Sequence, residues 1–370
     1  MQTKKNHPEN DPRYKALAVN EGVSNVPAVN PYKSTKTKRR RFSAREYLEG
    51  ILRGDIAVLS QAVTLVESSL PEHKQLAQDV IALCLPYAGN SVRIGITGVP
   101  GAGKSTFIEA MGMFLVKQNH KLAVLAIDPS SERSKGSILG DKTRMEELSV
   151  APNAFIRPSP SAGSLGGVAR KTRESIILCE AAGFDIIFVE TVGVGQSETA
   201  VHSMVDFFLL IQLAGTGDEL QGIKRGIMEM ADGIAINKSD GSNIEKSLLA
   251  KNQLESALHL FPIPDSGWKP QVIPCSAIEN TGISNIWNMV TDFIAFTKGN
   301  GFFYSQRNNQ SKYWMYESIN EQLRNNFYND AGINALIPDV EAKVLANEIS
   351  SFTGAKILLE YFYKHNITEK

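Results

Sequence analysis

The chain carries a complete G-x-x-x-x-G-K-[ST] motif at Gly98–Thr106, placed between an apolar run and a helical pattern. The run Val92–Thr97 has the β-branched, apolar character of a buried strand, and residues 105–118 show apolar spacing typical of a helix. A strand, a glycine loop and a helix in this order form the context in which the motif binds phosphate. The glycines let backbone N–H groups turn toward phosphate oxygens, and the helix N-terminus adds its positive end. The motif therefore predicts a nucleotide-binding α/β fold.

The residues of this loop have distinct expected roles. Lys104 is expected to reach the β- and γ-phosphates, and the Ser105 hydroxyl is expected to bind Mg²⁺. A glycine-rich turn without function is the alternative, and the flanking strand and helix argue against it. The residues expected to surround the phosphates are Gly98, Val99, Pro100, Gly101, Ala102, Gly103, Lys104, Ser105 and Thr106.

Apolar runs alternate with helical patterns over the middle of the chain. Strands are expected at 92–97, 122–127, 154–157, 185–190, 207–213, 233–237 and 271–275. Helices are expected near 105–118, 168–182, 219–231, 243–260 and 283–298. Such alternation predicts a mostly parallel central sheet with helices on both faces.

The charge balance narrows the partners that the chain could have. It holds 39 basic and 39 acidic residues, so no global charge points to nucleic acid. Residues 1–45 are the exception, with eleven Lys and Arg against three acidic residues. This region lacks apolar periodicity and the apolar centre of a secretory signal, so we interpret residues 1–44 as a disordered basic tail. A transit peptide remains the alternative, and the acidic residues argue against it.

Cysteine usage and hydropathy indicate a cytoplasmic protein that does not enter a membrane. Cys84, Cys179 and Cys275 are far apart and form neither a disulfide framework nor a C-x-x-C ligand pair. The longest apolar run, Phe207–Leu213, is too short to span a bilayer and is better explained as a buried strand.

A second motif predicts which base is bound. Asn237–Asp240 reads N-K-x-D and follows the apolar run Gly233–Ile236, so it is placed at the carboxyl end of a strand, where ligands bind. Asp240 would accept hydrogen bonds from N1–H and the amino group of guanine, whereas adenine would leave this carboxylate unpaired. The motif therefore favours GTP over ATP. The expected base contacts are Asn237, Lys238, Asp240, Ser276, Ala277 and Ile278.

Helical patterns flank the nucleotide-binding region. Ala44–Leu85 is predicted to hold two or three amphipathic helices, and helices are expected over Lys312–Phe327 and Val340–Tyr363, with a turn around 330–334 between them. The apolar stripe of the last two helices predicts either contact with a second copy or packing on their own nucleotide-binding domain. The expected organisation is a basic tail at 1–44, an N-terminal helical segment at 45–91, a P-loop GTPase domain at 92–300 and a helical dimerisation arm at 301–370.

Hard oxygen ligands for Mg²⁺ are available near the phosphate loop. Asp128 and Glu190 each end an expected strand, and Asp141 lies in the loop that follows the first of these strands. Together with Ser105 they are the candidate metal ligands. The alternative for each carboxylate is to cap a neighbouring helix.

Three glycine-containing loops are candidates for parts that respond to the nucleotide. The loop Glu190–Glu198 suits a switch beside the γ-phosphate, and Gln196 within it either orients the attacking water or is a surface amide. In the loop Gly217–Lys224, Lys224 either approaches phosphates or faces solvent. The loop Ser159–Gly167 either binds an anion or contacts a partner.

Taken together, these segments resemble the MeaB-like GTPases, chaperones associated with methylmalonyl-CoA mutase whose older names include ArgK and LAO/AO transport ATPase. The segments that carry the resemblance are Gly98–Thr106, 126–131, 140–145, 190–198, 217–224 and 237–240. The resemblance implies a G-domain of the SIMIBI type, slow GTP hydrolysis, a homodimer formed through the C-terminal arm, and a role in loading, gating or protecting adenosylcobalamin on a B12-dependent acyl-CoA mutase.

The same resemblance implies roles for single residues. Ser105, Asp128, Asp141 and Glu190 match the positions that build the magnesium site, and the loop 217–224 matches a third switch. The residues expected to serve catalysis are Lys104, Glu190, Gln196 and Lys224.

Two other functions are weighed against this interpretation. A kinase linked to basic amino-acid transport, the meaning of the older name, would use ATP, and Asp240 speaks against that nucleotide. A nickel chaperone would need a set of Cys and His ligands that the sequence does not offer.

Overall fold

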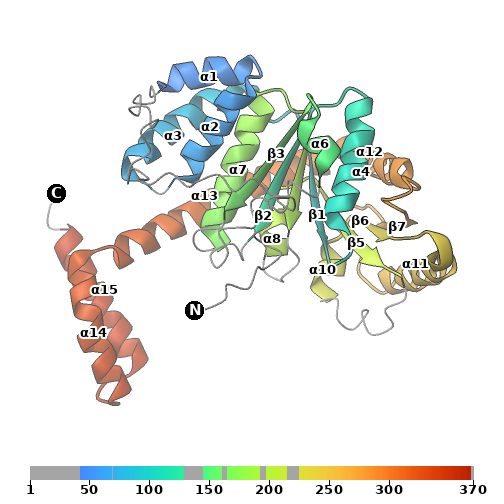
Figure 1. The fold of residues 1–370 in the computed structure, drawn as a ribbon. Coiled ribbons are helices and arrows are strands. Elements are labelled where there is room, and N and C mark those ends of the chain that lie inside the picture. The colour runs from blue at the N-terminus through green and yellow to red at the C-terminus, as the bar shows by residue number, and fades with distance from the viewer. Residues whose placement is uncertain are drawn as a thin grey trace, which may run out of the picture. The chain divides into compact units, whose positions relative to one another are not determined.

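Seven parallel strands form one sheet, in the order β3-β2-β4-β1-β5-β6-β7 (Figure 1). The computed structural model describes residues 42–68, 70–128, 145–160, 165–191, 197–214 and 225–367. The strands are β1 (Val92–Gly98), β2 (Leu122–Asp128), β3 (Ala154–Pro160), β4 (Ile186–Thr191), β5 (Phe207–Leu213), β6 (Gly233–Asn237) and β7 (Gln271–Pro274). All seven expected strands are present, with ends that shift by up to three residues. The mostly parallel α/β fold predicted from the sequence is confirmed.

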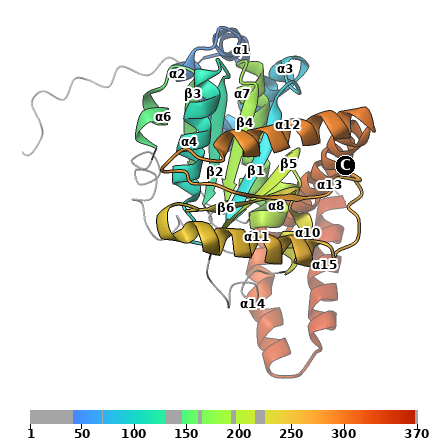
Figure 2. The same cartoon turned by 90° about the vertical axis from the view of Figure 1, so that its right-hand side faces the viewer.

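Helices cover both faces of the sheet (Figures 1 and 2). One face carries α4 (Lys104–Lys117), α6 (Glu146–Val150) and α12 (Ile283–Gly299). The other face carries α7 (Leu165–Ala181), α8 (Ser197–His202), α10 (Arg225–Met230) and α11 (Ile244–Leu258), the last preceded by a 3₁₀ turn at Gly241–Asn243. The strands are buried on both faces, which is why they appear in the sequence as continuous apolar runs.

From residue 42, where the described part of the chain begins, three helices precede the sheet and pack against α7. They are α1 (Ala44–Leu52), α2 (Ile56–Glu67) and α3 (Pro71–Cys84), followed by a 3₁₀ turn at Leu85–Tyr87. Ser43 and Glu46 form a capping box at the start of α1, and Asp55 caps α2 through the N–H groups of Ala57 and Val58. The prediction of two or three helices here is confirmed.

The C-terminal helices differ from their prediction in three places, one of which is that the first of them begins at Phe302 rather than at Lys312. They are α13 (Phe302–Tyr328), α14 (Ala331–Leu345) and α15 (Ser351–Ile367). The turn expected around 330–334 is shorter: the chain turns at Asn329–Asp330, and the Asp330 carboxylate accepts the Ile333 N–H, so that α14 starts at Ala331. The expected single helix over Val340–Tyr363 is also wrong: the chain breaks at Asn347, whose φ is 57°.

The first half of α13 is bonded to the sheet. Arg307 donates to both oxygens of Asp206, at 2.7 Å each, and to the carbonyl oxygens of Gly89 and Ser91. One turn further on, Gln310 donates to the Val205 carbonyl at 2.7 Å. These contacts join α13 to the residues just before β1 and β5.

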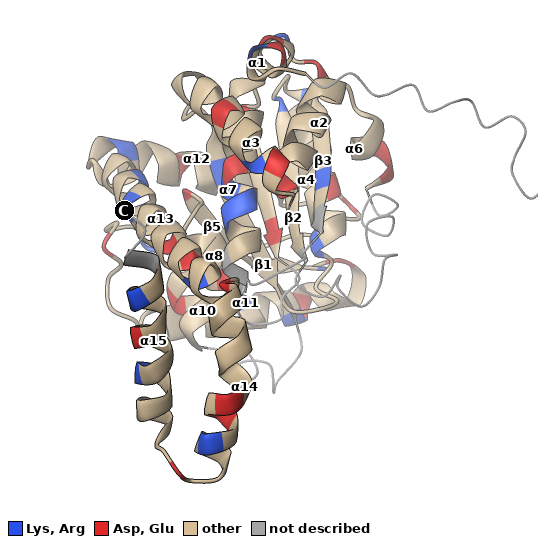
Figure 3. Cartoon of the chain, turned by 90° about the vertical axis from the view of Figure 1, so that its left-hand side faces the viewer, with Lys and Arg blue, Asp and Glu red and all other residues tan. Residues whose placement is uncertain are grey.

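The hairpin of α14 and α15 carries charged and apolar residues side by side. Figure 3 shows basic and acidic residues interspersed along both helices. Lys343 pairs with Asp339 on α14, and Lys356 pairs with Glu360 on α15. In the sequence between these two ion pairs, Leu345 and Phe352 have 83% and 86% of their surface exposed. Among the described residues no helix is long and apolar enough to cross a membrane.

Candidate nucleotide site

Because all strands run in one direction, their carboxyl ends meet at one edge of the sheet. This edge brings together the phosphate loop after β1, Glu190 in β4 and the N-K-x-D motif after β6. These three segments are far apart in the sequence. Their meeting is the arrangement that the two motifs require.

Two glycines allow the close packing of the phosphate loop. A Cβ atom on Gly98 would lie 2.3 Å from the Ile211 carbonyl oxygen of β5. Gly103 has a φ of 83°, and a Cβ there would lie 2.8 Å from Asn237 Nδ2. Any larger residue at Gly103 would therefore push the loop away from the N-K-x-D motif and would also adopt a strained backbone.

Lys104 lies over the loop that precedes it. The helix α4 begins at this residue, so its unpaired N–H groups face the loop. The buried Lys104 ammonium donates to the carbonyl oxygens of Gly98, at 2.9 Å, and Val99, at 3.3 Å. Burial lowers the pKa of Lys104, and the negative charges of Glu190 and Glu198 oppose this shift. These contacts are to neutral carbonyls, so a phosphate can replace them.

Ser105 and Glu190 meet where a magnesium site is expected. The Ser105 hydroxyl donates to Glu190 Oε1 at 3.4 Å, and Glu190 is buried near the end of β4. Next to it the Thr191 hydroxyl donates to the Thr97 hydroxyl at 2.8 Å, which ties β4 to β1. A hydroxyl and a carboxylate are hard oxygen donors of the kind that Mg²⁺ binds. Asp128 ends β2 at the same edge, but its side chain is not among those that the structure describes.

The N-K-x-D motif is bonded directly to the phosphate loop. The buried Asn237 side chain donates to the Ala102 carbonyl at 2.9 Å and accepts the Ala277 N–H at 3.1 Å. Lys238, with a φ of 59°, donates to the Gly101 carbonyl at 2.9 Å. Asn237 therefore links the loop after β1 with the turn after β7, and it fixes the distance between the phosphate and base regions.

The turn after β7 holds Asp240 in place. The Ser276 hydroxyl donates to Asp240 Oδ2 at 2.6 Å and accepts the Glu279 N–H at 3.2 Å. Ser276 is buried and Asp240 is partly exposed, so the carboxylate keeps access to a ligand. Ile278 is 76% exposed at the same turn, and its contact with the base stays a prediction.

Several expected site residues lie outside the described part of the chain. They are Asp141, Gln196 and Lys224, in the segments 129–144, 192–196 and 215–224. The candidate anion loop at 159–167 is affected in the same way, because 161–164 are not described.

Glu198 ends the predicted switch loop Glu190–Glu198, and sequence reasoning assigns it no role of its own. It lies in the first turn of α8, is buried, and acts electrostatically on Lys104. A carboxylate followed by the apolar residues Val201, Met204 and Val205 is a signal that could have marked it as facing inward.

Comparison with known proteins decides the family. The family model described as methylmalonyl Co-A mutase-associated GTPase MeaB matches residues 59–331. The chain belongs to the MeaB family of GTPases. A match over this range covers the phosphate loop, the N-K-x-D motif, the turn after β7 and the first of the C-terminal helices, α13.

Curated MeaB-family relatives extend over most of the chain. A probable GTPase of Mycobacterium tuberculosis is 47% identical over 307 residues, which cover 83% of this chain and 91% of the relative. GTPase ArgK of Escherichia coli is 46% identical, covering 85% and 96%. The mitochondrial methylmalonic aciduria type A homolog of Mus musculus is 45% identical, covering 88% and 80%.

A solved structure has the same fold. The crystal structure titled LAO/AO transport system kinase superposes with a TM-score of 0.69 at 40% identity, covering 86% of this chain and 97% of that one. The two chains are therefore similar in sequence as well as in fold.

Proposed function

We propose that this MeaB-family GTPase binds GTP with Mg²⁺, hydrolyses it slowly, and uses its nucleotide state to gate or protect adenosylcobalamin loading on methylmalonyl-CoA mutase or a related acyl-CoA mutase. The observation that carries the GTP part is the bond between Asn237 and Ala102. It joins a guanine-reading motif to a phosphate loop in one rigid unit. The mutase part is supported by the family description and the name of the mouse relative.

Guanine recognition rests on Asp240 and its support from Ser276. The carboxylate accepts from the N1–H and the amino group of guanine while Ser276 holds one of its oxygens. Adenine has an acceptor at N1 and no amino group at C2, so it would leave the carboxylate unsatisfied. A site of this kind rejects the wrong ligand by roughly 10⁴-fold.

The phosphates are bound by Lys104 and by the N–H groups of the loop. On nucleotide binding the Lys104 ammonium exchanges the carbonyl oxygens of Gly98 and Val99 for phosphate oxygens. Ser105, Asp128, Asp141 and Glu190 would hold Mg²⁺, whose chemistry is to neutralise the charge that develops on the β- and γ-phosphates. Gln196 would orient the attacking water, and Lys224 would report the state of the γ-phosphate.

The C-terminal helices are proposed as the contact with a second copy of the chain. Apolar residues such as Leu345 and Phe352 are exposed at 83% and 86% on α14 and α15. Ile357, Leu359 and Tyr363 of α15 are exposed as well, and a monomer rarely exposes a large contiguous apolar patch. We propose a cytoplasmic homodimer.

A kinase linked to basic amino-acid transport is the second candidate, because the similar solved structure carries a kinase title. The nucleotide separates the two candidates. Such a kinase would use ATP, and the Asp240–Ser276 pair is arranged to reject adenine.

The test compares nucleotides first and partners second. Calorimetry with Mg²⁺ should show GTP binding at least 100-fold more tightly than ATP. Asp240→Asn should move the preference toward xanthine nucleotides, whose C2 oxygen accepts from the amide, whereas the exposed control Asp292→Asn should not. Equal binding of GTP and ATP to the unmodified protein would overturn the guanine assignment.

The partner is tested by adding methylmalonyl-CoA mutase to the GTPase and measuring phosphate release. We expect acceleration by the mutase and none by a control enzyme that lacks cobalamin. No acceleration by this mutase, with GTP specificity intact, would contradict the partner and leave the GTPase assignment standing.

A further inference from the structure

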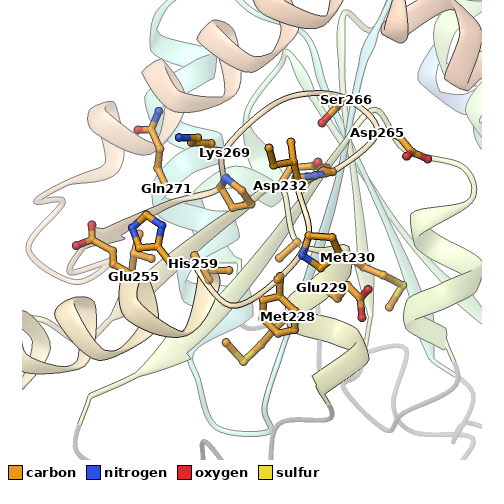
Figure 4. Close-up of a pocket in the computed structure, with 18 of the residues that line it drawn as sticks. Met228, Glu229, Met230, Asp232, Glu255, His259, Asp265, Ser266, Lys269 and Gln271 are labelled. Atoms are coloured by element: carbon orange, nitrogen blue, oxygen red, sulfur yellow. The ribbon is translucent and has the colours of Figure 1, made fainter.

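A pocket lies at the amino edge of the sheet, at the other end of β6 from the N-K-x-D motif. Its walls come from α10, α11, the loop 259–270 and the first residues of β7 and α13 (Figure 4). Its volume is about 900 Å³, which is in the range of small-molecule sites. The five residues of β6 separate it from the nucleotide site by about 16 Å. The GTPase reaction assigns no task to this pocket.

Asp232 is fixed in the middle of this pocket. Its Oδ2 accepts the Phe208 N–H at 2.8 Å, its own N–H donates to the Phe208 carbonyl, and its carbonyl accepts from Trp268 Nε1 at 3.0 Å. Figure 4 shows the side chain between Met228 and Met230 on one side and the 265–269 loop on the other. Within the described residues its Oδ1 has no hydrogen-bond partner. One carboxylate oxygen is therefore available to a ligand.

Acidic groups outnumber basic groups in the lining. Lys251 pairs with Glu255 on α11 at 3.7 Å, so these two charges offset each other. The remaining charges are those of Glu229, Asp232 and Asp265 against Lys269. An anion would meet a net negative charge here. The described residues also offer no group of three metal ligands, so a bare metal ion has no site.

The rest of the lining is apolar. It includes two methionines of α10, two aromatic rings and an isoleucine that is 74% exposed: Met228, Met230, Phe261, Phe302 and Ile263. Methionine and aromatic side chains adapt to the flat or chain-like body of an organic ligand. A ligand that satisfies both parts of the wall has a charged end and an apolar body.

We propose that this pocket binds a small organic cation, in which a primary ammonium group carried on an apolar body bonds to Asp232. The ammonium donates to Asp232 Oδ1, and the charge-assisted bond offsets the loss of its hydration. The apolar body lies against the methionine and aromatic side chains. The shape of the pocket and the fixed position of Asp232 select the class of ligand, and the net charge excludes anions.

The proposal predicts a characteristic pH dependence. Burial raises the pKa of Asp232 to about 7, the Phe208 N–H opposes this shift, and the nearby Asp206 adds to it. Asp206 itself is paired with Arg307. Burial lowers the pKa of His202, so this residue stays neutral near pH 7. The other ionisable groups that line the pocket are Glu229 of α10, Lys251, Glu255 and His259 at α11, and Asp265 and Lys269 of the loop.

Because the ammonium needs the ionised carboxylate, affinity should rise as the pH passes through 7. The ionised fraction of a carboxyl with a pKa of about 7 grows about tenfold between pH 6 and pH 8. A primary alkylamine keeps its charge over this range. Its affinity should therefore rise about tenfold, and that of a neutral analogue should not change.

The probe is 2-(4-fluorophenyl)ethylamine, observed by its ¹⁹F signal with the full chain saturated with GDP and Mg²⁺. The matched neutral probe is 2-(4-fluorophenyl)ethanol. We expect the amine to bind at pH 8, to bind about tenfold more weakly at pH 6, and to exceed the alcohol at least tenfold at pH 8. GDP and Mg²⁺ occupy the carboxyl edge, so the acidic residues there cannot account for binding.

Asp232→Asn keeps the acceptor for the Phe208 N–H and removes the charge, so it should reduce amine binding to the level of the alcohol. The control Asp292→Asn changes an exposed carboxylate of α12 and should bind like the unmodified chain. The proposal is overturned if the alcohol binds as well as the amine, if neither binds, or if a folded Asp232→Asn variant binds the amine unchanged. The pH series needs no variant, so it decides the question even if Asp232→Asn does not fold.

Discussion

At the carboxyl edge of the sheet the Lys104 ammonium rests on two neutral carbonyl oxygens, whereas at the amino edge Arg307 holds both oxygens of the Asp206 carboxylate. Arg93 and Glu180 form a second buried ion pair beside the latter. Charges at the amino edge are therefore mostly used within the fold, and charges at the carboxyl edge are kept for a ligand. We therefore expect substitutions at the amino edge to lower the stability of the fold, and substitutions at the carboxyl edge to lower nucleotide affinity.

The largest expected effect is that of Arg307→Ala at the amino edge. It leaves Asp206 buried without its guanidinium partner, and such a loss costs about 3 to 5 kcal/mol of unfolding free energy. GTP affinity of the fraction that stays folded should change less than twofold. Urea denaturation measures the first quantity and calorimetry the second. The control Arg324→Ala, an exposed residue further along α13, should stay within about 0.5 kcal/mol.

Asp232→Asn tests how the stability of the amino edge depends on pH. Burial raises the pKa of Asp232 from 3.8 to about 7, so between these values the folded chain keeps a proton that the unfolded chain has released. The contribution to stability thus falls as the pH rises from about 4 to about 7, by at most about 4 kcal/mol. The Asn variant should lack this fall. Urea unfolding at pH 5 and pH 8, compared with the parent and with Asp292→Asn, measures the difference; parallel curves would contradict it.

Lys104→Ala tests the carboxyl edge. It removes a charge-assisted phosphate contact worth about 1.5 to 3 kcal/mol, so GTP affinity should fall by roughly 10- to 150-fold and turnover should nearly vanish. Stability should change by less than about 1 kcal/mol, because the desolvation of the buried ammonium offsets the two bonds to loop carbonyls that are lost. Lys117→Ala, at the exposed end of α4, is the control. A large loss of stability would erase the contrast between the edges.

The smallest expected effect is that of Ser276→Ala. It removes the 2.6 Å hydrogen bond to Asp240, and a bond of this kind contributes about 0.5 to 1.5 kcal/mol. GTP affinity should fall about 2- to 12-fold, measured by calorimetry, with ATP binding unchanged. Ser256→Ala, on the exposed side of α11, should have no effect on either nucleotide. An equal effect on both nucleotides would assign Ser276 to the fold rather than to the base.

The fold could be predicted where the physical signal is local. A strand buried on both faces is a continuous apolar run, so β1 and β5 were visible in the sequence. The start of α13 was missed, because residues 302–311 show no apolar stripe and are fixed by bonds to Asp206 and Val205, about a hundred positions earlier. Asn347 was missed because the apolar spacing continues on both sides of it.

The residues of the site also fall into those that a local motif marks in the sequence and those that no local pattern marks. Gly98–Thr106 and Asn237–Asp240 are contiguous motifs, and the bonds of Asn237 and Lys238 to the phosphate loop join them. No motif assigns a role to Glu198 or Asp232, since what distinguishes these residues is burial beside residues distant in the sequence. The metal roles of Asp128 and Asp141 stay predictions.

The bonds of Arg307 also have a mechanical consequence for α13. A helix of 27 residues is about 40 Å long. The bonds of Arg307 and Gln310 fix its first half, and further along the pair Arg170–Glu321, at 3.8 Å, links it to α7. The helix forms a lever that pivots at Arg307, beside the residues that precede β1 and β5. A tilt of about 10° about Arg307 would carry the far end of the helix, about 32 Å away, through about 5.5 Å, if the helix stays straight. A displacement too small to disturb the sheet would thus be magnified at α14 and α15.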